Sequence, residues 1–253
     1  MDDDGHFGED VASHYDESDE PEFDPAVIEA TVDFLADLAG EGPALELAIG
    51  TGRIALPLAA RGIEVHGIDL SAAMVGRLRA KPGGRDIPVA IGDFSTTALD
   101  GLVGRCSLVY LVYNTIENLT TQAAQVEAFR NAARHLRPGG TFVIECTVPD
   151  LRRLPEGATA VVFAIGERHW GIDEYDVANQ GLVSHHFNVV DGRVEYGAWP
   201  FRYVWPAELD LMAQLAGLRL RDRWAGWGRE PFTSESRKHV SVWELPGRTA
   251  KRG

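Results

Sequence analysis

The chain has 253 residues, of which 45% are hydrophobic and 25% charged, enough for one α/β domain with a substantial core. Its formal net charge of −14 argues against a nucleic-acid partner, because nucleic-acid binding requires a basic surface. No apolar run approaches the roughly 18 residues of a membrane span, and the acidic start at Met1 is unlike a signal peptide. We therefore expect a cytoplasmic protein with no membrane partner.

Most of the acidity lies at the beginning of the chain. Residues 1–52 contain 16 of the 38 acidic residues and no Lys or Arg, so the remainder is close to neutral. Residues 1–24 are weakly patterned, and we expect them to form a solvated, partly disordered acidic segment.

Apolar patterns predict alternating helices and strands over residues 25–150. Asp24 is placed as a helix N-cap with Pro25 at the first helical position, and Ser71 as the N-cap of a later helix. The predicted helices cover residues 26–39, 53–61, 72–80 and 122–136. The predicted strands cover residues 44–49, 64–69, 88–92, 105–112 and 141–147. Strands that alternate with helices in this way form a parallel sheet with right-handed crossovers.

The pattern changes after Pro149, because residues 151–205 contain no convincing helix. Their β-rich runs are 158–165, 182–190 and 193–204. Asp191-Gly192 lies between the last two runs and is a strong hairpin signal. We therefore predict an antiparallel β insertion at 151–205, followed by elements that complete the first sheet. These are a helix at 206–216, strands at 217–224 and 238–245, and a polar tail at 246–253.

The loop after the first predicted strand is suited to approach a ligand closely. Gly50 and Gly52 separate that strand from a helix, and a Gly-x-Gly turn lets the backbone pass beside a cofactor. Asp69 closes the next strand, 17 residues after Gly52, where a carboxylate can accept hydrogen bonds from ribose hydroxyl groups. Together these residues indicate a nucleoside-cofactor site.

Glu46 favours a cationic cofactor over a dinucleotide. This acid lies inside the strand, four positions before Gly50, and would repel a pyrophosphate but tolerate an ammonium or sulfonium group. The acid and the glycine turn resemble motif I of the class I S-adenosylmethionine (SAM)-dependent methyltransferases, with Ala48 in place of the first glycine. The resemblance covers residues 25–150 and 206–245. It implies a seven-stranded Rossmann-like sheet with helices on both faces, six parallel strands and an antiparallel last strand.

The same resemblance implies a set of cofactor contacts. Asp69 would bind the ribose and Asp93 the adenine amino group, while Met74 would lie near the adenine ring. Tyr15 would close over the carboxylate of the cofactor. The expected cofactor-binding residues are Tyr15, Glu46, Ala48, Gly50, Gly52, Arg53, Asp69, Leu70, Met74, Asp93, Phe94 and Tyr113.

Candidate catalytic residues lie after the fourth strand and in the insertion. Glu117 follows that strand at the carboxyl edge of the sheet, where α/β proteins place their sites. His185 and His186 are adjacent in a predicted strand, so their side chains point to opposite faces and at most one enters the cleft. Each of the three is a candidate base. No metal-ligand spacing stands out, and Cys106 and Cys146 are expected to be buried thiols.

The resemblance implies methyl transfer from SAM to an oxygen or nitrogen atom of a small organic acceptor, such as a natural product or a sugar-like metabolite. The acidic N-terminal segment and the insertion would wall the open side of the cleft, and their composition, rich in aromatic and His residues without a basic stripe, suggests that the acceptor is small. Two alternatives remain open. One is a non-catalytic SAM-binding protein that dimerises through edge strands of the insertion, and the other is an NAD(P)-dependent oxidoreductase that uses the same glycine turn. A homodimer is therefore a candidate assembly.

Overall fold

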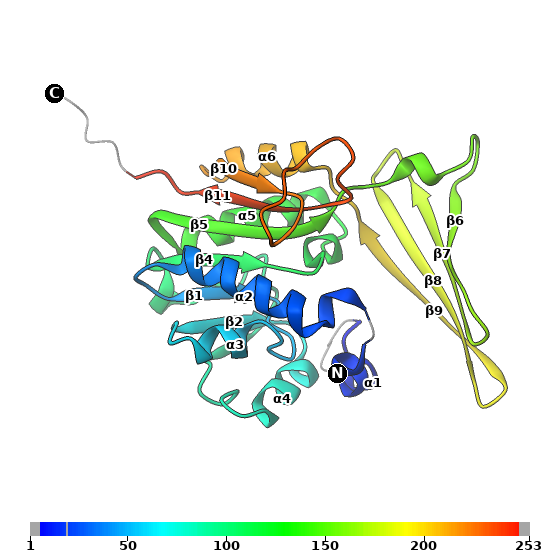
Figure 1. Cartoon of the computed structure of the whole chain (residues 1–253), viewed down its shortest axis with the longest axis horizontal. Coiled ribbons are helices and arrows are strands. Elements are labelled where there is room, and N and C mark those ends of the chain that lie inside the picture. The colour runs from blue at the N-terminus through cyan, green and yellow to red at the C-terminus, as the bar shows by residue number, and fades with distance from the viewer. Residues whose placement is uncertain (1–5, 19, 248–253) are drawn as a thin grey trace.

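A seven-stranded sheet forms the centre of the computed structural model, which describes residues 6–18 and 20–247 (Figure 1). The strand order is β10-β11-β5-β4-β1-β2-β3. Strands β1 to β5 pair in parallel, whereas β11 lies antiparallel between β5 and β10. The strands are β1 (Ala44–Leu47), β2 (Val65–Asp69), β3 (Val89–Ile91), β4 (Cys106–Leu111), β5 (Leu136–Thr147), β10 (Arg219–Trp224) and β11 (Lys238–Glu244). The predicted sheet of six parallel strands and an antiparallel last strand is confirmed.

Helices cover both faces of this sheet, as predicted. One apolar cluster packs α5 and α6 against the sheet through residues such as Phe129, Leu209 and Trp243. A second cluster lies on the other face, where Leu35 and Leu58 belong to α2 and α3. The helices are α2 (Pro25–Ala39), α3 (Ala55–Ala60), α4 (Ala72–Ala80), α5 (Gln122–His135) and α6 (Pro206–Leu215).

Local capping signals set two of the helix starts. The Asp24 side chain accepts a hydrogen bond from Ala26 N at 2.8 Å, and Ser71 Oγ accepts one from Met74 N at 3.0 Å. The end of α5 differs from the prediction, because β5 begins at Leu136 instead of residue 141. Leu136 pairs with Cys106 of β4, so the strand extends back through Pro138, Gly139 and Gly140.

The predicted insertion is a separate antiparallel sheet in the order β6-β7-β8-β9, which projects from the right-hand side of the core in Figure 1. Its strands are β6 (Ala160–Ile165), β7 (His169–Asp176), β8 (Gly181–Val190) and β9 (Arg193–Arg202). The hairpin at Asp191-Gly192 is confirmed, with both residues at positive φ. Strand β7 is missing from the prediction, because its three acidic residues interrupt the apolar alternation that identifies the other strands.

The N-terminal segment is ordered where the structure describes it, so the expectation of a partly disordered acidic segment is wrong for those residues. Residues 6–18 and 20–24 form a helix, α1 (Glu9–His14), and two 3-10 turns, η1 (Tyr15–Glu17) and η2 (Pro21–Phe23). Glu9 forms an ion pair with Arg77, and Asp16 pairs with Lys81 at 2.6 Å. Basic residues in and just after α4 therefore dock this acidic segment onto the core. The expectations for residues 1–5, 19 and 248–253 lie outside the described residues.

Cys106 and Cys146 are buried free thiols. Within the described ranges, no helix is long and apolar enough to cross a membrane. The same ranges hold no cluster of three or more His, Cys, Asp or Glu side chains arranged to bind a metal ion.

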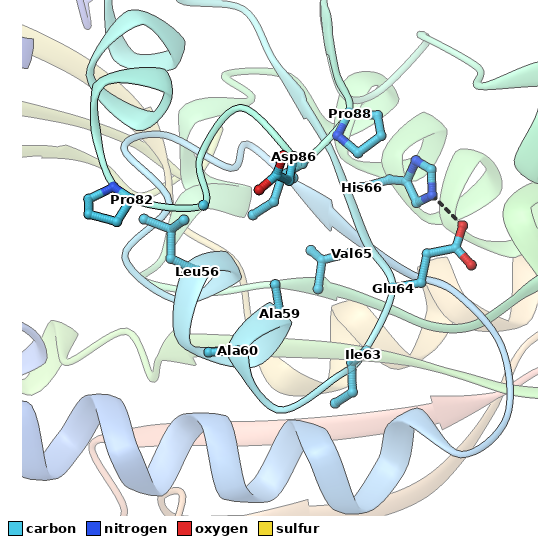
Figure 2. A pocket seen from close by; sticks show the side chains of 12 residues that line it. Leu56, Ala59, Ala60, Ile63, Glu64, Val65, His66, Pro82, Asp86 and Pro88 are labelled. Carbon is cyan, nitrogen blue, oxygen red and sulfur yellow. Dashed lines mark hydrogen bonds and ion pairs between the residues drawn. The ribbon is translucent and has the colours of Figure 1, made fainter.

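One hollow lies away from the glycine loop, at the amino ends of β2 and β3 (Figure 2). It has a volume of about 410 Å³, its lining is mostly apolar, and His66 Nε2 lies 2.8 Å from Glu64 Oε1 at its rim. Parallel α/β sheets bind ligands at the carboxyl ends of their strands. This hollow, which Asp86 helps to line, therefore lies at the opposite edge of the sheet from the expected site.

Candidate active site

The loop after β1 turns sharply through three residues in the left-handed region. Ala48, Gly50 and Gly52 have φ angles of 56°, 55° and 78°. At Gly52 the requirement for glycine is also steric, because a Cβ atom there would lie 1.9 Å from Leu78 Cδ1. The two glycines identified from the sequence are therefore needed for the backbone path. Ala48 has the same left-handed backbone conformation, although its Cβ atom makes that conformation unfavourable.

Replacing Ala48 by glycine should therefore stabilise the protein. We expect Ala48→Gly to raise the free energy of unfolding by about 0.5–1 kcal/mol, because glycine adopts positive φ without steric cost. Urea denaturation measures the change. The matched control is Ala30→Gly in the middle of α2, which should lower the unfolding free energy by about 1 kcal/mol. A loss of stability in Ala48→Gly would contradict the strain argument.

Asp69 ties the glycine loop to the helix that follows β2. Its Oδ2 accepts a hydrogen bond from Gly50 N at 2.6 Å and its Oδ1 accepts one from Ser71 N at 2.8 Å. Met74 lies beside the same loop, since a Cβ atom at Gly50 would be 3.3 Å from Met74 Cε. The structure thus brings together the loop, the acid and the methionine that the sequence analysis singled out.

The remaining residues expected near the adenine lie on neighbouring loops. Leu70 is half exposed directly after β2. Asp93 follows β3, which pairs with β2, and its Oδ1 accepts a hydrogen bond from Ser95 N at 2.7 Å. Phe94 is buried in the apolar core, with only 8% of its surface exposed. Asp93 and Leu70 are therefore accessible at this edge, whereas the Phe94 side chain is enclosed.

Glu46 is a buried acid at the end of β1. Its Oε2 accepts a hydrogen bond from Tyr110 Oη at 3.0 Å. Burial raises the pKa of Glu46 to about 8, although the Tyr110 hydrogen bond and the Arg53 charge act in the opposite direction. At pH 7 most Glu46 side chains are therefore protonated in the free protein. A cation bound beside this carboxyl would favour its ionised form.

A cationic cofactor, such as the SAM that the sequence resemblance implies, should accordingly release a proton when it binds beside Glu46. Because the pKa of Glu46 is about 8 in the free protein and a nearby cation lowers it, we expect nearly one proton to leave at pH 7. The affinity for such a cofactor should rise by roughly fivefold between pH 7 and 8, because about half of the free Glu46 side chains are ionised at the higher pH. Calorimetry in buffers of different ionisation enthalpy measures the proton count. Glu46→Gln should release none, and equal release from both proteins would assign the proton to another group.

Aromatic residues from the N-terminal segment and from β4 close over the glycine loop. The rings of Tyr15 and Phe23 pack edge to face with centroids 5.4 Å apart, and Phe23 packs against Tyr113 in the same way at 5.7 Å. The Arg53 guanidinium lies 4.8 Å from the Phe23 ring centroid and 5.2 Å from that of Tyr113. One small pocket is lined by the expected residues Tyr15, Glu46, Ala48, Gly50, Arg53 and Tyr113.

Glu145 is a structural residue that the sequence analysis missed. Tyr113 and Asn114 follow β4 in the left-handed region, with φ angles of 59° and 56°. Glu145 Oε2 accepts a hydrogen bond from Tyr113 N at 3.1 Å, and its Oε1 accepts one from Trp227 Nε1 at 3.0 Å. This buried carboxyl therefore holds the strained turn beside the small pocket. Its sequence signal is an acid inside the otherwise uncharged run 141–147.

A larger cavity of about 770 Å³ adjoins the small pocket. It lies between the N-terminal segment, the end of β4 and the inner face of the insertion sheet, and the two pockets share Tyr15, Tyr113 and Thr115. Among the described lining residues there is no Lys or Arg. The carboxylic acids that line it are Asp10, Glu20, Glu117 and Asp173. The aromatic residues that line it are Phe7, Tyr15, Phe23, Tyr113, Phe163, Trp199 and Phe201.

Glu117 is the most deeply buried acid of this cavity. It lies in the 3-10 turn η4 (Thr115–Asn118) and exposes only 9% of its surface. Its Oε1 accepts weak hydrogen bonds from Cys146 Sγ at 3.6 Å and from Thr147 Oγ1 at 3.5 Å. Burial, assisted by the nearby Asp173 charge, raises the pKa of Glu117 to about 7, although the hydrogen bonds from Cys146 and Thr147 act in the opposite direction. A carboxyl with this pKa can take up a proton near neutral pH.

The strand alternation separates the two candidate histidines. His186 lines the cavity. His185 is not among the lining residues; its Nδ1 lies 2.7 Å from Tyr196 Oη and its Nε2 lies 3.3 Å from Glu174 Oε2. Of the three candidate bases, the structure therefore brings Glu117 and His186 to the cavity and leaves His185 on the other face of the sheet.

Most of the remaining cavity lining was not identified from the sequence. The N-terminal segment contributes side chains such as Phe7, Asp10 and Glu20, for which no local pattern predicted a packed position. In the insertion, the alternation that places His186 inward also places Ser184 inward. The two-residue alternation of β8 was the sequence signal for these inward-facing residues. Because β7 pairs Asp173 with Ser184, the same alternation places Asp173 on the inner face.

Comparison with known proteins identifies the family. A family model described as a methyltransferase domain matches residues 44–140. The chain is 30% identical to the cypemycin N-terminal methyltransferase of Streptomyces sp over 205 residues, which cover 79% of this chain and 82% of that protein. The chain belongs to the class I SAM-dependent methyltransferases.

Solved structures agree with this assignment. The CcbJ methyltransferase from Streptomyces caelestis is 35% identical to this methyltransferase, with a TM-score of 0.84 over 96% of this chain and 99% of that chain. SAM-bound CalS10, an amino pentose methyltransferase from Micromonospora echinaspora, shares the fold at 20% identity, with a TM-score of 0.65 over 92% and 95% of the two chains. The oxidoreductase and non-catalytic alternatives are thereby set aside, and SAM is the cofactor of this methyltransferase.

Proposed function

We propose that this methyltransferase transfers the methyl group of SAM to an amine nitrogen of a small organic cation. The observation that carries the proposal is the lining of the 770 Å³ cavity, which combines four carboxylic acids with seven aromatic residues and, among its described residues, no Lys or Arg. Carboxylates and aromatic faces attract an ammonium group. An uncharged hydroxyl acceptor would bring no positive charge to balance these acids.

Names of similar proteins support a nitrogen acceptor. The cypemycin enzyme is an N-terminal methyltransferase, and CalS10 is an amino pentose methyltransferase. Both descriptions refer to an amino group. In the present chain, the acids of the cavity support a nitrogen acceptor independently, because they would attract its ammonium group.

We assign residues 25–150 and 206–245 to the SAM-binding core and residues 151–205 to the cover over the acceptor. The core residues fit SAM, because the buried Glu46 carboxyl would gain a cationic partner and the left-handed loop at Gly50 and Gly52 leaves room for a close approach. Asp69 would accept hydrogen bonds from the ribose hydroxyls. Arg53 and Tyr15 would bind the carboxylate end.

In this proposal, Glu117 is the general base. Bound SAM supplies an activated methyl carbon on a sulfonium sulfur. The Glu117 carboxylate takes a proton from the acceptor's ammonium group, and the freed nitrogen lone pair forms the N–C bond as the C–S bond breaks. The neutral thioether of S-adenosylhomocysteine would be the leaving group. Tyr113, which lines both pockets, aligns the two reactants and excludes water.

The predicted homodimer also remains a proposal, and it is supported by the outer face of the insertion sheet. That face, opposite His186, carries Ile165, Val194 and Tyr196, which are 81%, 64% and 59% exposed. Apolar surface of this kind is typical of a protein interface. Light scattering after gel filtration should give twice the chain mass, and a monomer would refute the assembly. The cytoplasmic location stays a prediction from the sequence.

A panel of matched acceptors tests the proposed function. Benzylamine, N-methylbenzylamine, piperidine and amino sugars are incubated with SAM and the full chain, alongside benzyl alcohol and the corresponding hydroxyl sugars. Release of S-adenosylhomocysteine is measured. We expect turnover with amines and none with the matched alcohols. Turnover restricted to hydroxyl acceptors would refute the nitrogen assignment.

A further inference from the structure

Four polar side chains on the cavity face of the insertion sheet form one hydrogen-bonded chain. His169 Nε2 lies 3.0 Å from His186 Nδ1, and His186 Nε2 lies 3.2 Å from Ser184 Oγ. Ser184 Oγ donates to Asp173 Oδ1 at 2.8 Å. Strands β7 and β8 pair Asp173 directly with Ser184, so the register of the sheet fixes the hydrogen bond between these two residues.

The Asp173 carboxylate determines the direction of every bond in this chain. An ionised carboxylate only accepts hydrogen bonds, so the single Ser184 hydroxyl proton points to Asp173. Ser184 Oγ must then accept from His186, which places the ring proton of His186 on Nε2. The bare Nδ1 atom of His186 in turn accepts from Nε2–H of His169. All three donors therefore point toward Asp173, and His186 is neutral.

The fold holds the His186 ring in place. Its two neighbours across the sheet, Gly171 and Gly197, are glycines, and aromatic rings occupy the space that their side chains would take. A Cβ atom at Gly171 would lie 2.1 Å from the ring of Phe163, and one at Gly197 would lie 2.7 Å from the ring of Trp199. These rings pack against His186 with centroid distances of 5.3 Å and 4.6 Å.

Neutral His186 follows from the same surroundings. Burial lowers the pKa of His186, and the neighbouring His169 lowers it further. Burial raises the pKa of the Asp173 carboxyl, whereas the hydrogen bond from Ser184 lowers it. The Ser184 donor thus counters the tendency of Asp173 to become protonated.

We propose that Ser184, His186 and His169 are positioning residues that hold Asp173 as an ionised carboxylate facing the cavity, where it anchors the ammonium group of the acceptor. The proposal rests on the proposed function for the nature of the acceptor. It separates two roles among the cavity acids, because Glu117 takes the proton while Asp173 binds the charge. It also explains why His186 is caged and neutral, since a protonated imidazole there would repel the acceptor.

Long-range ¹H–¹⁵N NMR spectra of the imidazole rings test the direction of the chain without any ligand. These spectra distinguish the Nδ1–H tautomer, the Nε2–H tautomer and the imidazolium form, and His169→Gln and His186→Gln assign the signals. We expect the neutral Nε2–H tautomer for His186 at pH 7 and a proton on Nε2 of His169. An Nδ1–H tautomer or a charged ring at His186 would reverse the donor chain and overturn the proposal.

Binding of benzylamine, a cation at neutral pH, tests the anchor in the complex with S-adenosylhomocysteine. We expect Ser184→Ala and Asp173→Asn to weaken benzylamine binding by roughly tenfold or more, the usual effect of losing a hydrogen bond to a charged group or the charge itself. Benzyl alcohol should show no such change. His185→Gln, on the other face of the same strand, is the matched control and should bind benzylamine like the wild type.

The outcomes separate this proposal from the proposed function. If both variants bind benzylamine as tightly as His185→Gln, or if the wild type does not bind it, the anchor is refuted even where amines are methylated. If benzylamine binding depends on Ser184 and Asp173 but no amine of the panel is methylated, the anchor stands and the proposed reaction fails. Titration with S-adenosylhomocysteine verifies that each variant is folded.

Discussion

Glu117→Gln should lower kcat for an amine acceptor by roughly 10²- to 10⁴-fold, the usual contribution of a general base. The glutamine keeps the size of the side chain but cannot take the proton from the ammonium group. Because burial raises the pKa of Glu117 to about 7, the wild-type kcat/KM should rise with pH through neutrality and level off above it, as the carboxylate ionises. The variant should lose this rising limb.

Glu127→Gln provides the control, because it makes the same chemical change on the exposed surface of α5, where Glu127 pairs with Arg130 at 2.5 Å. Its rate and pH profile should match the wild type. Initial rates of S-adenosylhomocysteine release between pH 5.5 and 9 give both profiles. A Glu117→Gln enzyme that retains more than about a third of wild-type kcat would exclude Glu117 as the base.

Asp69→Ala should weaken binding of S-adenosylhomocysteine by roughly 100-fold or more. The proposed ribose contacts are charge-assisted hydrogen bonds, each worth about 1.5–3 kcal/mol, and two of them correspond to at least this loss. The substitution also removes the acceptor for Gly50 N and Ser71 N, so the glycine loop loses its tie to the start of α4. Calorimetric titration of the wild type and the variant measures the difference.

Asp86→Ala makes the same change in the hollow at the opposite edge of the sheet and should leave the affinity unaltered. Asp69→Asn distinguishes the two parts of the effect. It keeps one carbonyl acceptor and the side-chain volume, so it should lose less affinity than alanine does. Wild-type affinity in Asp69→Ala would show that the ribose lies elsewhere, and the placement of SAM over the glycine loop would have to be abandoned.

Several features of the site could be read from the sequence because short-range chemistry controls them. Gly50 and Gly52 mark a turn that needs positive φ, and the caps at Asp24 and Ser71 satisfy the first amide groups of their helices. The opposite directions of His185 and His186 follow from the two-residue period of a strand. Each of these features depends on residues that are close together in the chain.

Other features depend on charges and strand pairings that are distant in sequence. The acidic N-terminal segment shows no local pattern, yet Glu9 and Asp16 meet Arg77 and Lys81, which lie about 65 residues further along. Strand β7 was not predicted, because its acidic residues interrupt the apolar alternation that marks a strand in the sequence. Hydrogen bonds to the neighbouring strand β8 stabilise it. Glu145 supports Tyr113 only because β4 and β5 lie side by side.

The sequence by itself thus indicated the glycine turn and the antiparallel insertion, because each is encoded in contiguous residues or in their periodicity. Its resemblance to the class I SAM-dependent methyltransferases implied the family and the seven-stranded sheet. The tertiary structure decided the character of the acceptor cavity. Asp10, Glu20, Glu117 and Asp173 come from three separate parts of the chain and gather around one space. Their combined charge, and the neutral state of His186, arise only when distant residues are brought together and shielded from water.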